Sequence, residues 1–499
     1  MPSCDVIVIG GGTNGLACAA RLAAKGRRTV LLEAAETPGG GAATREFAPG
    51  YHAPALAHTT RGIDPRVLSG MDLERHGLTF HPALTTTILG PDPLTVKRAA
   101  TSGPDAKAFA ALHTKLSDFA RVLAPFRALT PPRLTTQNDW PRLARLGLGI
   151  RALGRDDFRE FLRMILINIA DVAEDELTDN RLRGLLAFDA TLGAWAGPRS
   201  PNTLILLLNQ LAIGPDILLP KGGMGQVAQV MAKAAQAAGV DLRCGQRVAR
   251  VMVEADRATG VELTSGERIT APTIISAISP RTTLQNLVGP RHLDAGFFQR
   301  IGHIRSRGGA AKLHLALNGT PDFAADLKSR LVIAPSVDAV ELAFNPVKYG
   351  EVPARPVMEL ILPSAHDPEL APEGHHTLSA IVQFAPHDPK TGLTSARAEL
   401  LENTLAVLET HAPGLRALIA HAELLMPQDI EARFGMVGGN WHHGELAVEQ
   451  MLFLRPLREA AQYSTPLPGL YLAGAGSHPG GGITGAAGWN AAERVLHDE

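Results

Sequence analysis

Cysteine is scarce in this sequence. Three cysteines occur among its 499 residues, Cys4, Cys18 and Cys244, and no two of them form a CxxC pair. A disulfide reductase needs a redox dithiol, so the lack of one excludes that class of enzyme. So few thiols are typical of a reducing compartment, and we expect a cytoplasmic protein.

The sequence also lacks an excess of either charge and a long apolar run. Its 48 basic and 49 acidic residues give a net charge of −1, which offers no general attraction for nucleic acid. The most apolar stretch ends at Asn209 and is far shorter than the roughly 20 residues of a membrane span. The first predicted strand begins at Asp5, which leaves no room for a secretory signal. We expect a soluble chain with, at most, peripheral membrane contact.

The N-terminal residues carry a dinucleotide-binding fingerprint. An apolar strand at residues 5–9 leads into a glycine turn, an Ala/Leu-rich helix, and a second strand that ends at Glu33. Gly10 permits the tight turn, Gly12 lets the backbone approach a pyrophosphate, and Gly15 lets helix and strand pack closely. The helix N-terminus then receives the phosphates and Glu33 accepts the ribose hydroxyls. This βαβ unit predicts an ADP-containing ligand.

Two further glycine-rich turns favour FAD over a nicotinamide cofactor. One follows Glu33 at residues 37–44, and the other, at residues 474–485, leads into a helix near the C-terminus. A flavin dinucleotide can use the first helix end for its pyrophosphate and a second one for its isoalloxazine. Backbone amides at residues 482–484 could stabilise the negative charge that reduction builds on the flavin.

These elements together resemble the phytoene-desaturase superfamily of FAD enzymes, which is related to the amine oxidases. The stretches 51–81, 438–444 and 476–485 are most similar to the branch named after pyridine nucleotide-disulphide oxidoreductase domain-containing protein 2. The resemblance implies that Val248 contacts the adenine side. Many relatives have arginines where this chain has Ala35 and Gly41, so those cationic contacts to FAD are missing. The residues expected to contact FAD are Gly10, Gly12, Thr13, Asn14, Gly15, Glu33, Ala34, Gly40, Gly41, Ala42, Val248, Gly474, Ala475, Gly482, Ile483 and Thr484.

The fold class expected is α/β (α+β overall), with three parts. The resemblance implies a discontinuous Rossmann-like FAD-binding domain at residues 1–65, 218–290 and 425–499. A β-sheet substrate domain takes residues 66–100 and 291–424, and a helical insertion takes residues 101–217. Apolar residues at helical spacing from Phe109 to Leu123 predict the first inserted helix, with Pro104 at its first position. The helical faces are most simply core, but one of them could line a lipophilic pocket or touch a membrane.

The chemistry is expected at the C-terminal part of the chain. His443 and His478 are the candidates for a catalytic base, because a histidine titrates near neutrality. Tyr51, His52, Asn440 and Trp441 are expected to shape the substrate pocket. No HExxH, clustered Cys/His or EF-hand motif occurs, so no metal is expected.

These observations predict an FAD-dependent oxidoreductase that desaturates, oxidises or isomerises a largely apolar organic substrate by hydride transfer to flavin N5. A flavin amine oxidase is one alternative, although aromatic residues, which such enzymes place around a cationic amine, are 5% of the chain. A flavin-holding scaffold or interaction protein with secondary catalysis is another. The sequence does not fix the substrate, the electron acceptor, the oligomeric state or the mode of flavin attachment.

Overall fold

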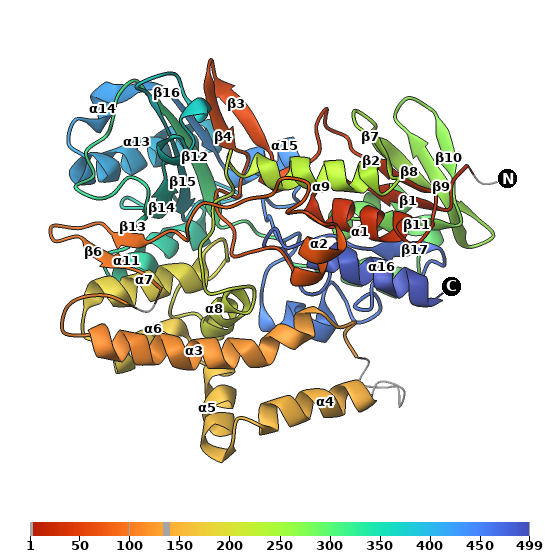
Figure 1. The fold of residues 1–499 in the computed structure, drawn as a ribbon, viewed down its shortest axis with the longest axis horizontal. Helices are drawn as coiled ribbons and strands as arrows, with labels where there is room; N and C mark the ends of the chain where they lie inside the picture. Colours follow the sequence, from red (N-terminus) through yellow and green to blue (C-terminus); the bar gives the residue numbers. More distant parts are fainter. Residues whose placement is uncertain (1–2, 99, 133–139, 499) are drawn as a thin grey trace.

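The computed structural model describes residues 3–98, 100–132 and 140–498. The predicted mixed α/β architecture is confirmed: a parallel sheet lies on one side, a larger mixed sheet lies on the other, and a group of helices lies beneath the larger sheet in Figure 1. Both termini lie beside the parallel sheet. The domain limits predicted from the sequence stay predictions.

The parallel sheet has five strands in the order β17-β11-β1-β2-β7. Side chains of β1 alternate between its two faces, as the pleat requires: Val6 and Val8 pack against helices, and Ile7 and Ile9 pack against a three-stranded meander. The strands are β1 (Val6–Ile9), β2 (Thr29–Leu32), β7 (Asp241–Arg243), β11 (Thr273–Ser276) and β17 (Leu470–Leu472). The covering helices are α1 (Thr13–Ala23), α9 (Gly225–Ala237) and α16 (Ala486–Asp498). The meander consists of β8 (Val248–Glu254), β9 (Arg257–Leu263) and β10 (Arg268–Thr270).

The larger sheet has seven strands in the order β16-β12-β15-β14-β13-β5-β6. Helix α13 (Leu393–His411) packs Ala396, Leu400 and Leu408 onto one face of it. The strands are β5 (Thr86–Ile88), β6 (Leu94–Val96), β12 (Ala310–Leu317), β13 (Arg330–Ile333), β14 (Val357–Ile361), β15 (His376–Gln383) and β16 (Ile419–Leu425); the hairpin β3 (Thr44–Ala48) and β4 (Tyr51–Pro54) lies beside it.

Six consecutive helices follow on the other side of the larger sheet. The first begins at Ala106 after Asp105, so the prediction that Pro104 is its first helical residue was wrong by two positions. Its apolar stripe, which includes Phe109, Leu112 and Leu116, packs with the other helices and with Val332 of the sheet. The helices are α3 (Ala106–Arg127), α4 (Trp140–Arg151), α5 (Arg155–Leu166), α6 (Ile169–Glu176), α7 (Asn180–Thr191) and α8 (Thr203–Leu211).

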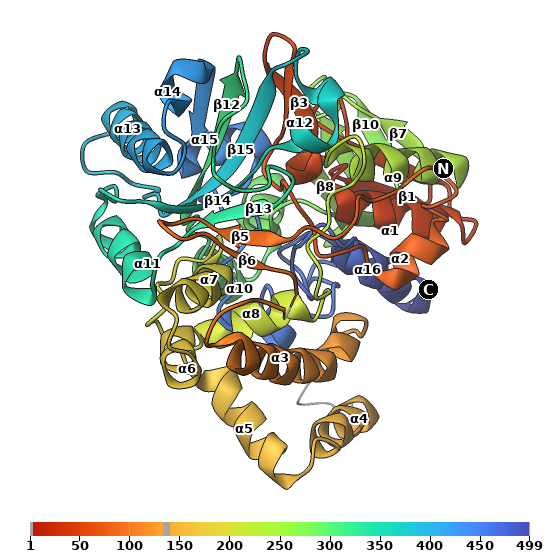
Figure 2. The same cartoon turned by 60° about the vertical axis from the view of Figure 1, so that its left-hand side comes forward.

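Helices α4 and α5 form an arm that extends away from the body of the molecule in both views (Figures 1 and 2). Shorter helices connect the layers: α2 (Pro65–Gly70), α10 (Ala295–Gly302), α11 (Val337–Phe344), α12 (Pro363–His366), α14 (Leu415–Leu418) and α15 (Pro427–Phe434). In the described part of the chain, no helix is long and apolar enough to cross a membrane.

Candidate FAD site and adjoining cavity

The first glycine turn has the geometry that a pyrophosphate needs. Gly10 adopts a φ of +99°, which favours glycine. A Cβ atom on Gly15 would lie 1.9 Å from the Gly10 carbonyl oxygen, so only glycine lets α1 pack this closely on the strand. At Gly12, by contrast, an added Cβ would meet nothing within 4 Å. The three predicted roles of these glycines, a turn, an open approach and close packing, therefore match their surroundings.

Glu33 is held at the tip of β2 by backbone amides. Its Oε2 accepts a 2.6 Å hydrogen bond from the Gly11 N–H, and its Oε1 accepts a 2.8 Å bond from Ala35. The Gln246 N–H donates to the Glu33 carbonyl at 2.8 Å, and β8 begins two residues later at Val248. The predicted FAD contacts Glu33, Ala34 and Val248 thus lie at the same edge of the parallel sheet.

The second glycine turn lies directly on the first. The Gly39 N–H donates a 2.9 Å hydrogen bond to the Gly11 carbonyl, and a Cβ on Gly40 would lie 3.6 Å from Cα of Gly12. Gly40, Gly41 and Ala42 form one 3₁₀ turn at this place. The tertiary structure therefore brings all the predicted residues of both N-terminal turns together.

The C-terminal turn brings a second helix N-terminus beside the first. A Cβ on Gly488 of α16 would lie 1.8 Å from the Asn14 carbonyl oxygen of α1, so the two helices touch near their N-terminal ends. Thr484 Oγ1 accepts a 3.2 Å hydrogen bond from the Ala486 N–H at the start of α16. Ile483, just before it, has a φ of +63°, which is unusual for a branched residue. Gly482, Ile483 and Thr484 therefore precede this helix end, as the sequence predicts.

The residues present fit an FAD. Gly12 leaves an open cradle, two helix N-termini converge, and the side-chain oxygen of Asn14 is buried with no partner in the described structure. Anionic groups are stabilised at helix N-termini, and a buried polar atom needs a hydrogen-bond partner. The diphosphate of FAD suits the helix N-termini, and a hydroxyl group of FAD can donate the hydrogen bond that the Asn14 oxygen lacks.

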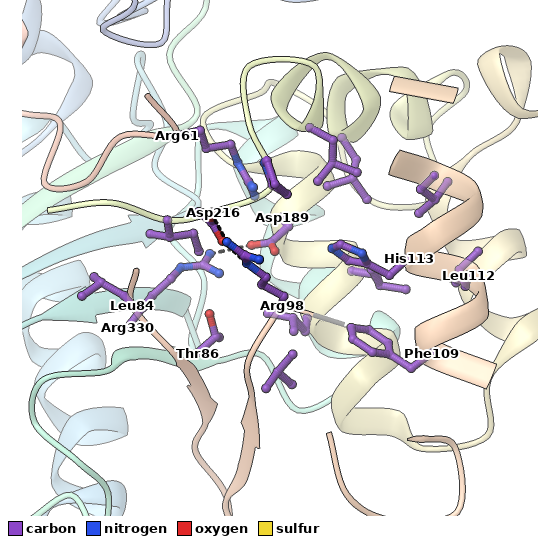
Figure 3. A pocket seen from close by; sticks show the side chains of 18 residues that line it. Arg61, Leu84, Thr86, Arg98, Phe109, Leu112, His113, Asp189, Asp216 and Arg330 are labelled. Atoms are coloured by element: carbon purple, nitrogen blue, oxygen red, sulfur yellow. Dashed lines mark hydrogen bonds and ion pairs between the residues drawn. The ribbon is translucent and has the colours of Figure 1, made fainter. Parts of the chain in front are cut away.

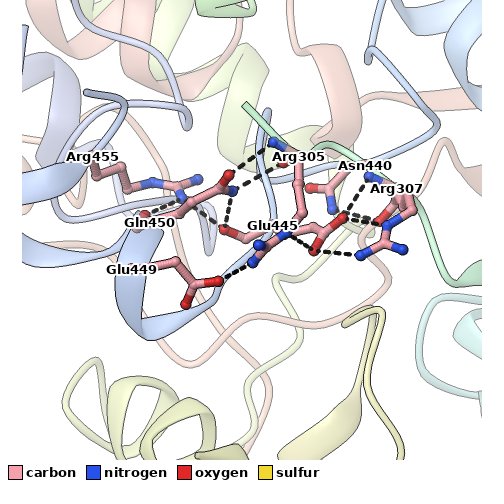
Figure 4. A network of polar contacts seen from close by, with 7 residues as sticks. All are labelled: Arg305, Arg307, Asn440, Glu445, Glu449, Gln450 and Arg455. Atoms are coloured by element: carbon pink, nitrogen blue, oxygen red, sulfur yellow. Dashed lines mark hydrogen bonds and ion pairs between the residues drawn. The ribbon is translucent and has the colours of Figure 1, made fainter. Parts of the chain in front are cut away.

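Arg455 anchors the loop that precedes the C-terminal turn. Its guanidinium is buried and donates to the carbonyls of His442, Gly444, Glu445, Gln450 and Ala475. Burial lowers the pKa of Arg455 to about 10. This side chain therefore ties the loop at residues 442–450 to Ala475, one of the predicted FAD contacts. Figure 4 shows Arg455 beside Gln450 of that loop.

Glu445 forms the other centre of that loop. Its buried carboxylate pairs with Arg307 at 2.8 Å and with Arg305 at 3.1 Å. Asn440, close by in Figure 4, donates from Nδ2 to the Arg307 carbonyl and accepts from the His442 N–H at 2.9 Å. Because its amide is engaged on both sides, Asn440 shapes the loop.

His443 lies in this loop, and His442 beside it is the neighbour that the sequence reasoning passed over. Burial, followed by the charge of Arg455, lowers the pKa of His443 to about 4 and that of His442 to about 3. His442 Nε2 accepts a 3.1 Å hydrogen bond from Trp441, and its Nδ1 would lie 2.7 Å from a Cβ on Gly481. Trp441 and both histidines therefore lie beside the C-terminal turn. Both imidazole rings are neutral at physiological pH.

His478 has a structural partner. Its Nε2 donates a 2.7 Å hydrogen bond to the carbonyl oxygen of Phe126, at the end of α3. Burial lowers its pKa to about 4. An imidazole with so low a pKa is a weak base at neutral pH. The hydrogen bond to Phe126 instead favours a structural role for His478, which joins α3 to the C-terminal turn.

Tyr51 lies apart from the other predicted pocket residues. Its hydroxyl is 2.5 Å from Nδ1 of His375, and its ring packs with Ala316 of β12 and Ala371. His52, the next residue on β4, is half-buried and its Nδ1 has no partner in the described structure. The structure thus does not bring Tyr51 together with Asn440 and Trp441.

The sequence reasoning missed a chain of buried charged groups. Lys312 Nζ donates to His58 Nδ1 at 2.9 Å, and His58 Nε2 donates to Glu359 at 3.0 Å. Glu359 also accepts from Arg330 at 2.5 Å, and Arg330 in turn pairs with Asp189. Single charged residues inside the apolar strands β12, β13 and β14 are the signal that could have revealed it.

Burial sets the protonation of this chain of groups. It lowers the pKa of Lys312 to about 7, and together with the Lys312 charge it lowers that of His58 to about 4. Burial alone would raise the pKa of Glu359, but Arg330 and the hydrogen bond from His58 hold it well below its usual range. Glu359 is therefore an anion flanked by donors.

A cavity opens between the helices and the larger sheet, beside this network. The empty space in and around it, open solvent at its mouth included, is about 700 Å³. Figure 3 shows Arg61, Asp189, Asp216 and Arg330 at one end of it, with Phe109, Leu112 and His113 of α3 at the other. Thr60, next to Arg61, donates a 3.4 Å hydrogen bond to the carbonyl of Gly482. The cavity is therefore adjacent to the C-terminal glycine turn.

Fold and site together define an FAD-binding oxidoreductase. The sequence matches the flavin containing amine oxidoreductases over residues 15–496, and the chain belongs to that family. FAD is accordingly its cofactor.

Curated relatives include a protein named for an oxidoreductase domain and a desaturase. Pyridine nucleotide-disulfide oxidoreductase domain-containing protein 2 of Rattus norvegicus is 29% identical, over 100% of this chain and 94% of the relative. Hydroxyneurosporene desaturase of Cereibacter sphaeroides is 28% identical, over 99% of this chain and 97% of the relative. Among solved structures, putrescine oxidase bound to putrescine has a TM-score of 0.62 at 16% identity, covering 99% and 98% of the two chains. At that identity the likeness shows the shared fold alone.

Proposed function

We propose that this oxidoreductase desaturates, oxidises or isomerises a largely apolar organic substrate held in the cavity between the helices and the larger sheet. The observation that carries the proposal is the lining of that cavity. Its walls are mainly leucines of three helices, α3, α7 and α8, and it adjoins the C-terminal glycine turn through Thr60. Apolar walls with a few polar groups at one end are typical of small-molecule sites.

The chemistry divides between the cofactor and the protein. Bound FAD supplies a two-electron acceptor that takes a hydride at N5. The helices around the cavity exclude water from the apolar part of the substrate, and the loop anchored by Arg455 positions the C-terminal turn. His478 lies in that turn and His442 and His443 lie in the loop beside it; all three rings are neutral, and their lowered pKa values make them weak bases at neutral pH.

The charges of the cavity argue against a cationic amine as substrate. Three arginines and two aspartates line it, so guanidinium groups are in excess over carboxylates, and Phe109 is the one phenyl ring in its lining. An ammonium ion is stabilised between aromatic faces and repelled by guanidinium groups. The amine-oxidase alternative therefore ranks below oxidation of an apolar substrate, although the relatives include both chemistries by name.

We also propose peripheral contact with a lipid bilayer through the arm formed by α4 and α5. Most of the large exposed apolar side chains of the described structure lie there: Trp140, Leu148, Phe158, Leu162 and Leu166. A patch of this kind is costly in water, and α5 packs against α8, a wall of the cavity. The arm would thus connect an apolar phase to the substrate site.

Anaerobic reduction of the flavin tests the enzymatic proposal. Purified protein that shows no absorption near about 450 nm, and that cannot be reconstituted with FAD, would contradict it. Polyenes, terpenes and long-chain compounds should bleach this band, and primary amines should not. Bleaching by amines alone would establish the amine-oxidase alternative, and bleaching by no compound of either panel would favour the flavin-holding scaffold.

A further inference from the structure

The carboxylates at the charged end of the cavity are already paired with arginines. Asp216 forms a two-point pair with Arg98. Asp189 accepts from Arg330 at 2.5 Å, and Arg330 also binds Glu359, which lies behind the cavity wall. Each of these carboxylates thus has a guanidinium partner.

Arg61 is the arginine of this end that has no carboxylate. In the described structure its one hydrogen bond goes to the Gly214 carbonyl, at 3.3 Å. Burial lowers its pKa, but a guanidinium remains charged at any physiological pH. Asp189, Asp216 and Glu359 act on its charge without a printed hydrogen bond to it, so most of its N–H donors remain available to an anion in the cavity.

Arg330 provides a second free donor next to Arg61. Its Nη1 is buried and has no hydrogen-bond partner in the described structure, although its Nε and Nη2 are engaged. Figure 3 shows the Arg61 and Arg330 guanidinium groups at the same end of the cavity. Two guanidinium groups with unused N–H donors form a site for a carboxylate or similar anion.

The remainder of the cavity is apolar. The helices α3, α7 and α8 contribute Leu112, Leu116, Leu185, Leu186, Leu207 and Leu211 to its walls. His113 is the polar side chain on that side, and burial, followed by the charge of Arg61, lowers its pKa. His113 is therefore neutral and adds no charge to the walls.

We propose that the cavity binds an anionic amphiphile, with a carboxylate-type head group between Arg61 and Arg330 and an apolar chain along the leucine walls. This assignment rests on the proposed function, because that function places the substrate in this cavity. Thr60 bonds to Gly482, so the head-group end is also the end nearest the C-terminal glycine turn. The carbons closest to the head group therefore lie nearer the flavin end than the tail does.

Calorimetric titration of the FAD-loaded protein tests this assignment with decanoate and decanol, which share a chain and differ in charge. Decanoate should bind on the order of tenfold more tightly, because charge-assisted hydrogen bonds to the guanidinium groups are added to the same apolar contacts. Decyltrimethylammonium should bind more weakly than either. Equal binding of the acid and the alcohol overturns the proposal without any variant being needed.

Substitutions at two arginines test where the carboxylate head group binds. Arg61→Gln should abolish the preference for decanoate while leaving decanol affinity unchanged, and Arg61→Lys should restore part of it. The double variant Arg98→Gln and Asp216→Asn is the matched control, because it removes an arginine of the same cavity together with its paired carboxylate. A preference that survives Arg61→Gln contradicts the assigned head-group site.

Different measurements would contradict this proposal and the proposed function. A protein that holds no FAD, or whose flavin no substrate reduces, defeats the function. FAD-loaded protein that shows no preference for the acid defeats the ligand class alone.

Discussion

The Nη2 atom of Arg455 donates a 2.8 Å hydrogen bond to the carbonyl oxygen of Ala475. Ala475 follows β17 at the entrance to the C-terminal glycine turn, and Arg455 belongs to the segment that closes the loop carrying His442 and His443. One buried guanidinium thus connects two parts of the candidate active site.

Replacing Arg455 with lysine should destabilise the protein and weaken FAD binding. Lysine keeps the charge but cannot reach five carbonyls, and the groups left unpaired in the interior should lower the free energy of unfolding by roughly 3 kcal/mol. Denaturant titration and FAD affinity measure the two effects. Arg458→Lys is the control, because that side chain is 80% exposed. Equal stability of the two variants would show that the contacts of Arg455 contribute little.

The pair Gly12→Ala and Gly15→Ala should separate cofactor binding from folding. A methyl group on Gly12 meets no protein atom, so thermal stability without FAD should be unchanged, whereas FAD affinity should fall on the order of tenfold because the methyl occupies the phosphate approach. A methyl on Gly15 would lie 1.9 Å from the Gly10 oxygen, so stability should fall as well. Thermal melts and FAD titration distinguish these outcomes; unchanged FAD affinity in Gly12→Ala would place the pyrophosphate elsewhere.

Acid should destabilise the protein partly through His478. Burial lowers the pKa of His478 to about 4, below the roughly 6.5 of an unfolded histidine, so the unfolded state binds the extra proton first. The stabilisation is complete above about pH 6.5 and is lost as the pH falls towards 4, at a cost of about 3 kcal/mol at most.

The variant His478→Asn should therefore lose less stability than the wild type between pH 7 and pH 4.5, as measured by denaturant unfolding. His497→Asn serves as the control, since that ring is 80% exposed. Parallel pH profiles for all three proteins would contradict the role given to His478.

Charged substitutions on the arm should reduce binding to lipid vesicles. Phe158→Glu combined with Leu162→Glu places two anions on the exposed apolar surface of α5 and should reduce vesicle cosedimentation several-fold. Leu342→Glu is matched to them, because Leu342 of α11 is 68% exposed but lies away from the arm. A loss of binding in Leu342→Glu as well, or binding by neither wild type nor variant, contradicts the membrane role.

The fold and the cofactor site were largely predictable because their signals are local. The three-to-four-residue apolar spacing in α3 reports burial on one face, whichever element covers that face. The start of α3 was misplaced because Pro104 suits a first helical position, yet the helix begins after Asp105. The sequence could not reveal that Phe126 is the partner of His478, since the two lie far apart in the chain.

The sequence by itself determined the cofactor. The turn at Gly10, the phosphate approach at Gly12 and the acid at Glu33 belong to one βαβ unit, so their geometry follows from short-range sterics and hydrogen bonding. The tertiary structure alone decided what the substrate cavity offers. Arg61, Asp189 and Arg330 come from separate segments, and whether each charge is paired depends on long-range packing that no local pattern encodes.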